Sequence, residues 1–113
     1  SGKAVALKAV CENNEWKGDG MDLQYIKVYA VDKSGRRVPL CTEDVHFSVS
    51  GAATLLATDN GDHYTNELMA VNPKRMKDGF VMAILRADKQ PGKVTLSITS
   101  PQLKAQKLTF VTK

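Results

Sequence analysis

KVTLSIT at residues 93–99 and QKLTFV at residues 106–111 are the two stretches that decide the fold class. In each stretch an apolar residue stands at every second position: Val94, Leu96 and Ile98 in the first, Leu108 and Phe110 in the second. In an extended chain, residues two apart lie on the same face. Both stretches are therefore predicted to be β-strands with one face in a hydrophobic core.

Five more short runs of strand character precede these two along the chain. They cover residues 4–10, 23–31, 45–50, 53–58 and 80–87, and turn-forming Gly, Pro, Asn and Asp separate them. The run at residues 80–87 has apolar residues on both of its faces, which is typical of a central strand covered on both faces. No window has the 3.6-residue period of a helix, so the sequence predicts an all-β sandwich of about seven strands in two antiparallel sheets.

The segments between the runs carry specific turn chemistry. Asp32-Lys33-Ser34-Gly35 places a glycine where a reversal needs positive φ, and Asn60-Gly61 is a strong hairpin signal. Residues 62–78 have the least strand character and are predicted to be a long connection.

Length and composition are those of one ordinary globular domain covering residues 1–113. The chain is 42% hydrophobic and 25% charged, enough for one core without a metal or a disulfide. Residues 1–3 are interpreted as a tag remnant or linker. Cys11 and Cys41 could pair in an oxidising compartment or act as small hydrophobes, and the sequence leaves this open.

The net charge of +4 does not predict a nucleic-acid partner. The basic residues are scattered, and their two clusters, at residues 36–37 and 74–77, contain no aromatic residue for base stacking. No run approaches the roughly 20 apolar residues of a membrane helix, so membrane insertion is not expected either.

The sequence predicts no catalytic residue, no cofactor and no metal site. His46 and His63 stand apart from any nucleophile or hydrolase motif. The oxygen-rich segment Asp59-Asn60-Gly61-Asp62 could hold calcium, but it lacks the spaced acids of an EF-hand, and a turn capped by its own side chains is the favoured interpretation.

Contact with a sugar or with a neighbouring domain is the remaining role for polar and aromatic loop residues. The candidates are Trp16, Asp59, Asn60, Asp62, Tyr64 and Arg75. Tyr25 and Tyr29 are further aromatic candidates for a sugar platform. Trp16 has two interpretations, an exposed platform for a sugar ring or a plug over the end of the sandwich.

Two groups of motifs resemble known families. Asp19-Gly20-x-Asp22-Leu23, the turn at residues 31–39 and Phe47-x-Val49-x-Gly51 resemble bacterial immunoglobulin-like repeats of the invasin and intimin type. Residues 55–62 (LLATDNGD) and Asp78-Gly79-Phe80 resemble the C-terminal domain of glycoside hydrolase family 2 β-galactosidases. The resemblance extends from about residue 5 to residue 111.

This resemblance implies an immunoglobulin-like sandwich within a larger secreted glycosidase, in a periplasmic or extracellular location. In such enzymes a TIM barrel carries the catalytic carboxylates, and no position here matches those motifs. The implied role is a non-catalytic accessory domain that packs on other domains of its parent through residues 59–63 and 66–78. The alternatives are a carbohydrate-binding module, whose partner would be a glycan, and an adhesin-type stalk repeat.

Overall fold

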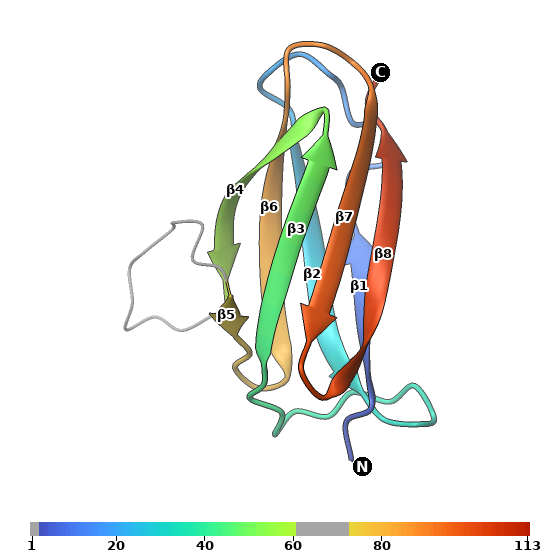
Figure 1. The fold of residues 1–113 in the computed structure, drawn as a ribbon, viewed down its shortest axis with the longest axis vertical. Coiled ribbons are helices and arrows are strands. Elements are labelled where there is room, and N and C mark those ends of the chain that lie inside the picture. The colour runs from blue at the N-terminus through green and yellow to red at the C-terminus, as the bar shows by residue number, and fades with distance from the viewer. Residues whose placement is uncertain (1–2, 61–72) are drawn as a thin grey trace.

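The computed structural model describes residues 3–60 and 73–113 (Figure 1). Within these ranges the chain forms no helix and eight strands: β1 (Ala6–Cys11), β2 (Leu23–Val31), β3 (Asp44–Gly51), β4 (Ala53–Asp59), β5 (Lys74–Arg75), β6 (Phe80–Ala87), β7 (Lys93–Ser100) and β8 (Leu103–Val111). The predicted all-β fold is confirmed, and each of the seven predicted runs is a strand. The eighth, β5, lies in the segment that was predicted to be a connection.

The strands form two layers, as Figure 1 shows. One layer has the order β4-β6-β2-β1 and the other β8-β7-β3-β5, with antiparallel pairing within each. One strand pairing joins the two layers. Ala6 of β1 pairs in parallel with Lys104 of β8, so hydrogen bonding runs continuously from one layer into the other.

Side chains from both layers fill the space between them. From β7, the predicted core residues Val94, Leu96 and Ile98 are completely buried. On β6, Val81, Ala83, Leu85 and Ala87 are also completely buried, whereas the alternate residues are only half-buried or exposed. The interpretation of β6 as covered on both faces is therefore wrong within the described chain, because only its inner face is packed.

A two-residue hairpin joins the segment after β5 to β6. Lys77 and Phe80 exchange both backbone hydrogen bonds, each 3.0 Å long, across Asp78 and Gly79. Asp78 has φ 54° and Gly79 has φ 68°, the left-handed pair that a type I′ turn requires. The tight turn places residues 76–78 at the same end of the sandwich as the start of β3, since Met76 N–H donates to Glu43 O at 3.0 Å.

The two ends of the described chain lie at opposite ends of the sandwich (Figure 1). The molecule measures 42 × 31 × 21 Å along its principal axes. Lys113 lies beside the loop between β1 and β2, where its N–H donates to Trp16 O at 2.9 Å. Residue 3 lies at the other end, which is called the lower end below.

Candidate functional site

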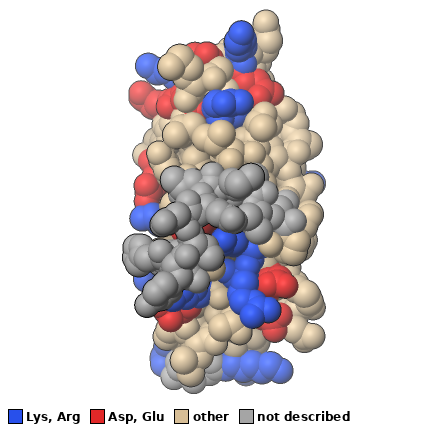
Figure 2. All heavy atoms as spheres, turned by 90° about the vertical axis from the view of Figure 1, so that its left-hand side faces the viewer, with Lys and Arg blue, Asp and Glu red and all other residues tan. Residues whose placement is uncertain are grey.

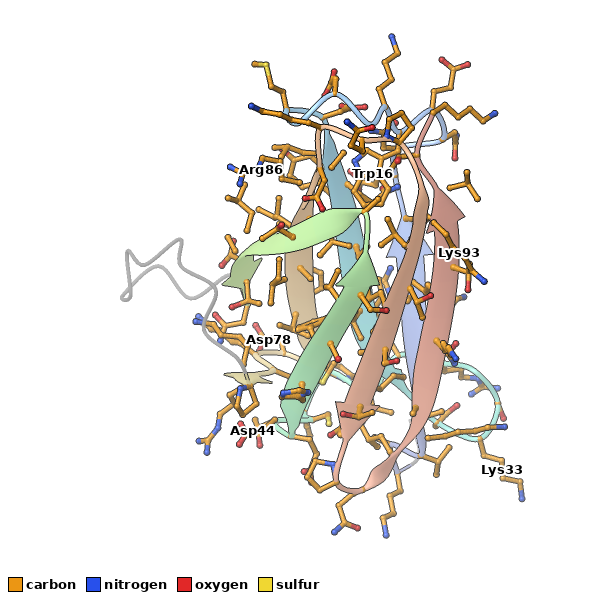
Figure 3. All side chains as sticks on the ribbon, turned by 45° about the horizontal axis from the view of Figure 1, so that its top comes forward. Trp16, Lys33, Asp44, Asp78, Arg86 and Lys93 are labelled. Atoms are coloured by element: carbon orange, nitrogen blue, oxygen red, sulfur yellow. The ribbon has the colours of Figure 1, made fainter. Side chains whose placement is uncertain are left out.

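Trp16 is buried at the end of the sandwich opposite Asp44 (Figure 3). Its side chain is 3% exposed, its Nε1–H donates to Asp22 O at 2.9 Å, and its ring meets Phe110 edge-on at 5.5 Å. A sugar platform needs a free ring face. Trp16 therefore has the geometry of the plug, and the interpretation as an exposed platform is wrong.

The loop around Trp16 uses its polar groups internally. Asp22 Oδ2 accepts hydrogen bonds from Lys17 N–H at 2.8 Å and from Asn13 Nδ2 at 3.2 Å. These donors, led by the backbone N–H of Lys17, lower the pKa of the Asp22 carboxyl. The side-chain amide of Gln24, itself buried, pairs with the backbone N–H and C=O of Asn13. This end is thus held together by its own hydrogen bonds.

Asn60 and Arg75 are brought together near the opposite, lower end. Asn60 Nδ2 donates to the backbone oxygen of Arg75 at 2.9 Å, which ties the end of β4 to β5. Asp59 is the last residue of β4 and is half-buried. Asp62 and Tyr64, with His63, lie outside the described residues, so the suggested group of contact residues is seen only in part.

A hollow of about 380 Å³ is lined by Asn60 and Arg75 together with residues that the sequence interpretation did not single out. They include Pro39, Leu40, Met76 and Asp78. Leu40 also lines a second hollow of about 500 Å³, whose lining residues include Lys3, Ala4 and Leu103. Leu40 itself is 90% exposed and borders both hollows, and this projecting apolar side chain is called the ridge below.

One signal in the sequence could have identified this ridge. Val38-Pro39-Leu40-Cys41 follows the turn at residues 32–35 and contains three hydrophobic residues outside any predicted strand. Val38 is 9% exposed and anchors the loop, because its N–H donates to Ala30 O at 2.9 Å. Cys41 N–H donates to Val38 O at 3.3 Å, and between these anchored residues the Leu40 side chain faces outward.

The charges at the lower end are mixed. Arg75 Nε lies 3.6 Å from Asp44 Oδ1, and both side chains are at least half exposed, so solvent screens this ion pair. In Figure 2, which faces the side of β4 and β5, basic groups gather in the lower half with acidic groups beside them. This end therefore combines an apolar ridge with both signs of charge.

The described residues offer little reactive chemistry. In residues 3–60 and 73–113 there is no group of three or more His, Cys, Asp or Glu side chains that could hold a metal ion. His46 is exposed on β3, and Cys11 and Cys41 are both free thiols. Burial raises the pKa of the Cys11 thiol, which makes it a weaker nucleophile. None of the described residues forms a helix long and apolar enough to cross a membrane.

The described residues thus form a β-sandwich with one end closed by its own hydrogen bonds and, at the other end, an exposed leucine among charged residues. A family model described as "Glycoside hydrolase family 2 C-terminal domain 5" matches residues 7–109. The chain belongs to this family of domains.

Relatives of known name are much longer than this chain. It is 28% identical to "Beta-galactosidase BoGH2A" of Bacteroides ovatus, covering 92% of this chain and 14% of that protein. It is 30% identical to a "Beta-glucuronidase" of Formosa agariphila, covering 95% of this chain and 11% of that protein. The chain therefore spans about an eighth of the length of these relatives.

Solved structures agree with this assignment. A glycosyl hydrolase family 2 member from Bacteroides cellulosilyticus superimposes with a TM-score of 0.92 at 28% identity, covering 99% of this chain and 14% of that one. The D00-D0 domain of intimin has a TM-score of 0.68 at 18% identity, covering 99% of this chain and 50% of that one. The intimin match supports the fold alone, and it confirms the predicted immunoglobulin-like sandwich.

Proposed function

We propose that this chain is a non-catalytic accessory domain of a larger family 2 glycosidase and that it packs against another domain of the same polypeptide. The observation that carries the proposal is the match itself. Nearly the whole chain corresponds to about an eighth of relatives that are named as glycosidases. The residues that carry out hydrolysis would then lie elsewhere in the parent.

The substrate of the parent is proposed from the same relatives. One is named a β-galactosidase and the other a β-glucuronidase, and we favour a β-galactoside, as the sequence motifs at residues 55–62 and 78–80 do. Parallel assays of the full-length enzyme with aryl β-galactosides and aryl β-glucuronides separate the two. Turnover of the glucuronide alone would remove the β-galactosidase assignment.

The lower end is the proposed contact with the preceding part of the parent. The family is described as a C-terminal domain, so the remainder of such enzymes comes before it. Lys3, Ala4 and Leu40 line the same hollow. The ridge therefore lies next to the point where the preceding part of the polypeptide would join the sandwich. An exposed leucine bordered by two hollows can pack into a complementary surface of another domain.

Cysteine labelling of the full-length enzyme tests this contact. In a full-length background whose native cysteines, Cys11 and Cys41 among them, are replaced by serine, Leu40→Cys and Met21→Cys introduce single thiols at opposite ends. These positions are 90% and 78% exposed in the chain described here. If the lower end is docked, Cys at 40 should react with a maleimide at least about tenfold more slowly than Cys at 21. Equal rates would show that the lower end is open to solvent and would remove this contact.

The cellular location is a further part of the proposal, and it rests on the resemblance to exported enzymes. We propose that the parent acts in the periplasm or outside the cell. Fractionation of the native host with an antibody to this domain tests it. Recovery of the enzyme with cytoplasmic markers would contradict the proposal.

A further inference from the structure

The outer faces of the two layers differ in composition. On β3 and β7 the outward residues of three alternate pairs are all polar: His46 with Thr99, Ser48 with Ser97, and Ser50 with Thr95. This composition suits a surface that stays in water.

The outer face of β2 and β6 is aromatic and aliphatic instead. Tyr25 pairs with Ile84, and Tyr29 pairs with Phe80. Opposite residues of an antiparallel pair share a face. All four side chains are half-buried, as is Met82 beside them. These five residues, Tyr25, Tyr29, Phe80, Met82 and Ile84, are called the aromatic face below.

Cationic side chains surround this aromatic face. The guanidinium carbon of Arg37 lies 3.8 Å from the centroid of the Tyr29 ring. Arg86, on β6, points away from the sandwich (Figure 3). Lys8 and Lys27 share the same face by their register with β2 and β6. Lys27 Nζ forms an ion pair with Glu12 Oε1 at 2.6 Å, and Asp59 lies opposite Met82 on β6, so the positive charge of this face depends on Lys8, Arg37 and Arg86.

We propose that the aromatic face is a second docking surface, and that its occupant is an acidic surface of another domain of the same parent enzyme. Tyr, Phe, Met and Arg are the residue types enriched in protein interfaces. The occupant follows from the length of the relatives, most of which lies outside the match. This inference therefore rests on the proposed function, although it uses a different surface from Leu40.

The local geometry argues against two other occupants. A sugar ring stacks on a free aromatic face, but Arg37 covers one face of Tyr29 and Phe80 is tilted by 44° against it, so the two rings form no coplanar platform. A second copy of this chain would bring together two faces that each carry Lys8, Arg37 and Arg86, and like charges across an interface oppose association.

Matched cysteines on the two outer faces test the proposal. In a background whose native cysteines, Cys11 and Cys41 among them, are replaced by serine, Met82→Cys probes the aromatic face and Ser97→Cys probes the polar face. Both positions are half-buried in the chain alone. In the full-length enzyme, maleimide labelling at 82 should be at least about tenfold slower than at 97. In the 113-residue chain the two rates should be similar. Tyr25→Cys is the second probe if the variant at 82 does not fold.

Charge reversal tests the acidic character of the occupant. In the full-length Met82→Cys background, Arg86→Glu should raise the labelling rate at 82 several-fold. Lys107→Glu is the matched control, since Lys107 is an exposed basic residue on the polar face, and it should leave the rate unchanged.

Three outcomes would overturn the inference. Equal labelling rates at 82 and 97 in the full-length enzyme would show that the aromatic face is exposed to solvent. If labelling at 40 were slow in the same enzyme, the proposed contact at the lower end would still stand. Protection at 82 that fades on dilution identifies a second copy as the occupant. A change in the labelling rate at 82 on addition of a soluble galactan would identify a glycan as the occupant.

Discussion

At the scale of single residues, Trp16 shows that the neighbouring sequence does not determine whether a loop side chain is buried. Its neighbours Glu15 and Lys17 are exposed, and from them the ring could face either way. What buries it comes from residues distant in sequence, because Phe110 packs against its ring and Lys113 pairs with its backbone. The burial of a loop aromatic depends on such contacts, which no local pattern contains.

Asp22 should make the stability of the domain depend on pH. Hydrogen bonds from Lys17 and Asn13 lower its pKa from the ordinary 3.8. A lowered pKa in the folded state contributes stability above the ordinary value, and this stability is lost as the pH falls through the folded-state value. Asp22→Asn should therefore be less stable than the natural chain at neutral pH, and the difference should shrink below about pH 4.

Urea unfolding of the two proteins at a series of pH values measures this effect. The free energy of unfolding should fall more steeply with acidification in the natural chain than in the variant. Parallel pH profiles would show that the carboxylate of Asp22 contributes nothing that an amide does not.

At the scale of elements, alternation in the sequence was sufficient to locate seven strands, because each has one buried face and is long enough to display a period of two. The short strand β5 has two residues, Lys74 and Arg75, which is too few for any period. The hairpin after β5 does have a local sequence signal, because Asp78-Gly79 is a dipeptide that favours a type I′ turn.

Gly79→Ala should destabilise the fold more than the same change at Gly35. Both glycines have positive φ, which costs an alanine about 1–2 kcal/mol. A Cβ at residue 79 would also lie 2.2 Å from Val38 O, whereas at residue 35 nothing lies within 4 Å. The variant at 79 should therefore lose at least about 1 kcal/mol more. Equal losses in chemical denaturation would mean that the loop at residue 38 moves aside freely.

At the scale of the whole molecule, the continuous hydrogen bonding between the layers was beyond prediction. It depends on β1 and β8, which lie almost a full chain length apart, and a single parallel pair, Ala6 with Lys104, forms it. The side chain of Gln106 adds to this joint, since its Nε2 donates to Leu7 O at 2.9 Å. In the sequence, Gln106 is simply the polar residue that begins the last alternating run.

Gln106→Ala should weaken the joint by about 1 kcal/mol, because it removes one partly buried hydrogen bond and leaves the backbone oxygen of Leu7 without this donor. Gln102→Ala is the control, at an exposed position in the turn between β7 and β8, and should change stability by less than about 0.5 kcal/mol. Thermal unfolding of both variants measures the difference. A loss no greater at 106 than at 102 would show that the joint does not depend on this side chain.

The candidate contact surfaces were predictable only in part at this scale. The basic and turn-forming residues at positions 60 and 75 were recognised from sequence, and both line the hollow at the lower end. Leu40 is not among the residues predicted from sequence, and Tyr25 and Tyr29 of the aromatic face are predicted only as candidates for a sugar platform. An outward-facing apolar residue is distinguished from a core residue by the direction of its side chain, and this direction depends on which strands come together.

The placement of the two chain ends has a mechanical consequence. Residue 3 and Lys113 lie at opposite ends of a body 42 Å long. Pulling on these ends loads the strands lengthwise, and in such shear the hydrogen bonds between adjacent strands bear the force together. Any segments joined to these two ends would therefore be held apart by the full length of the sandwich.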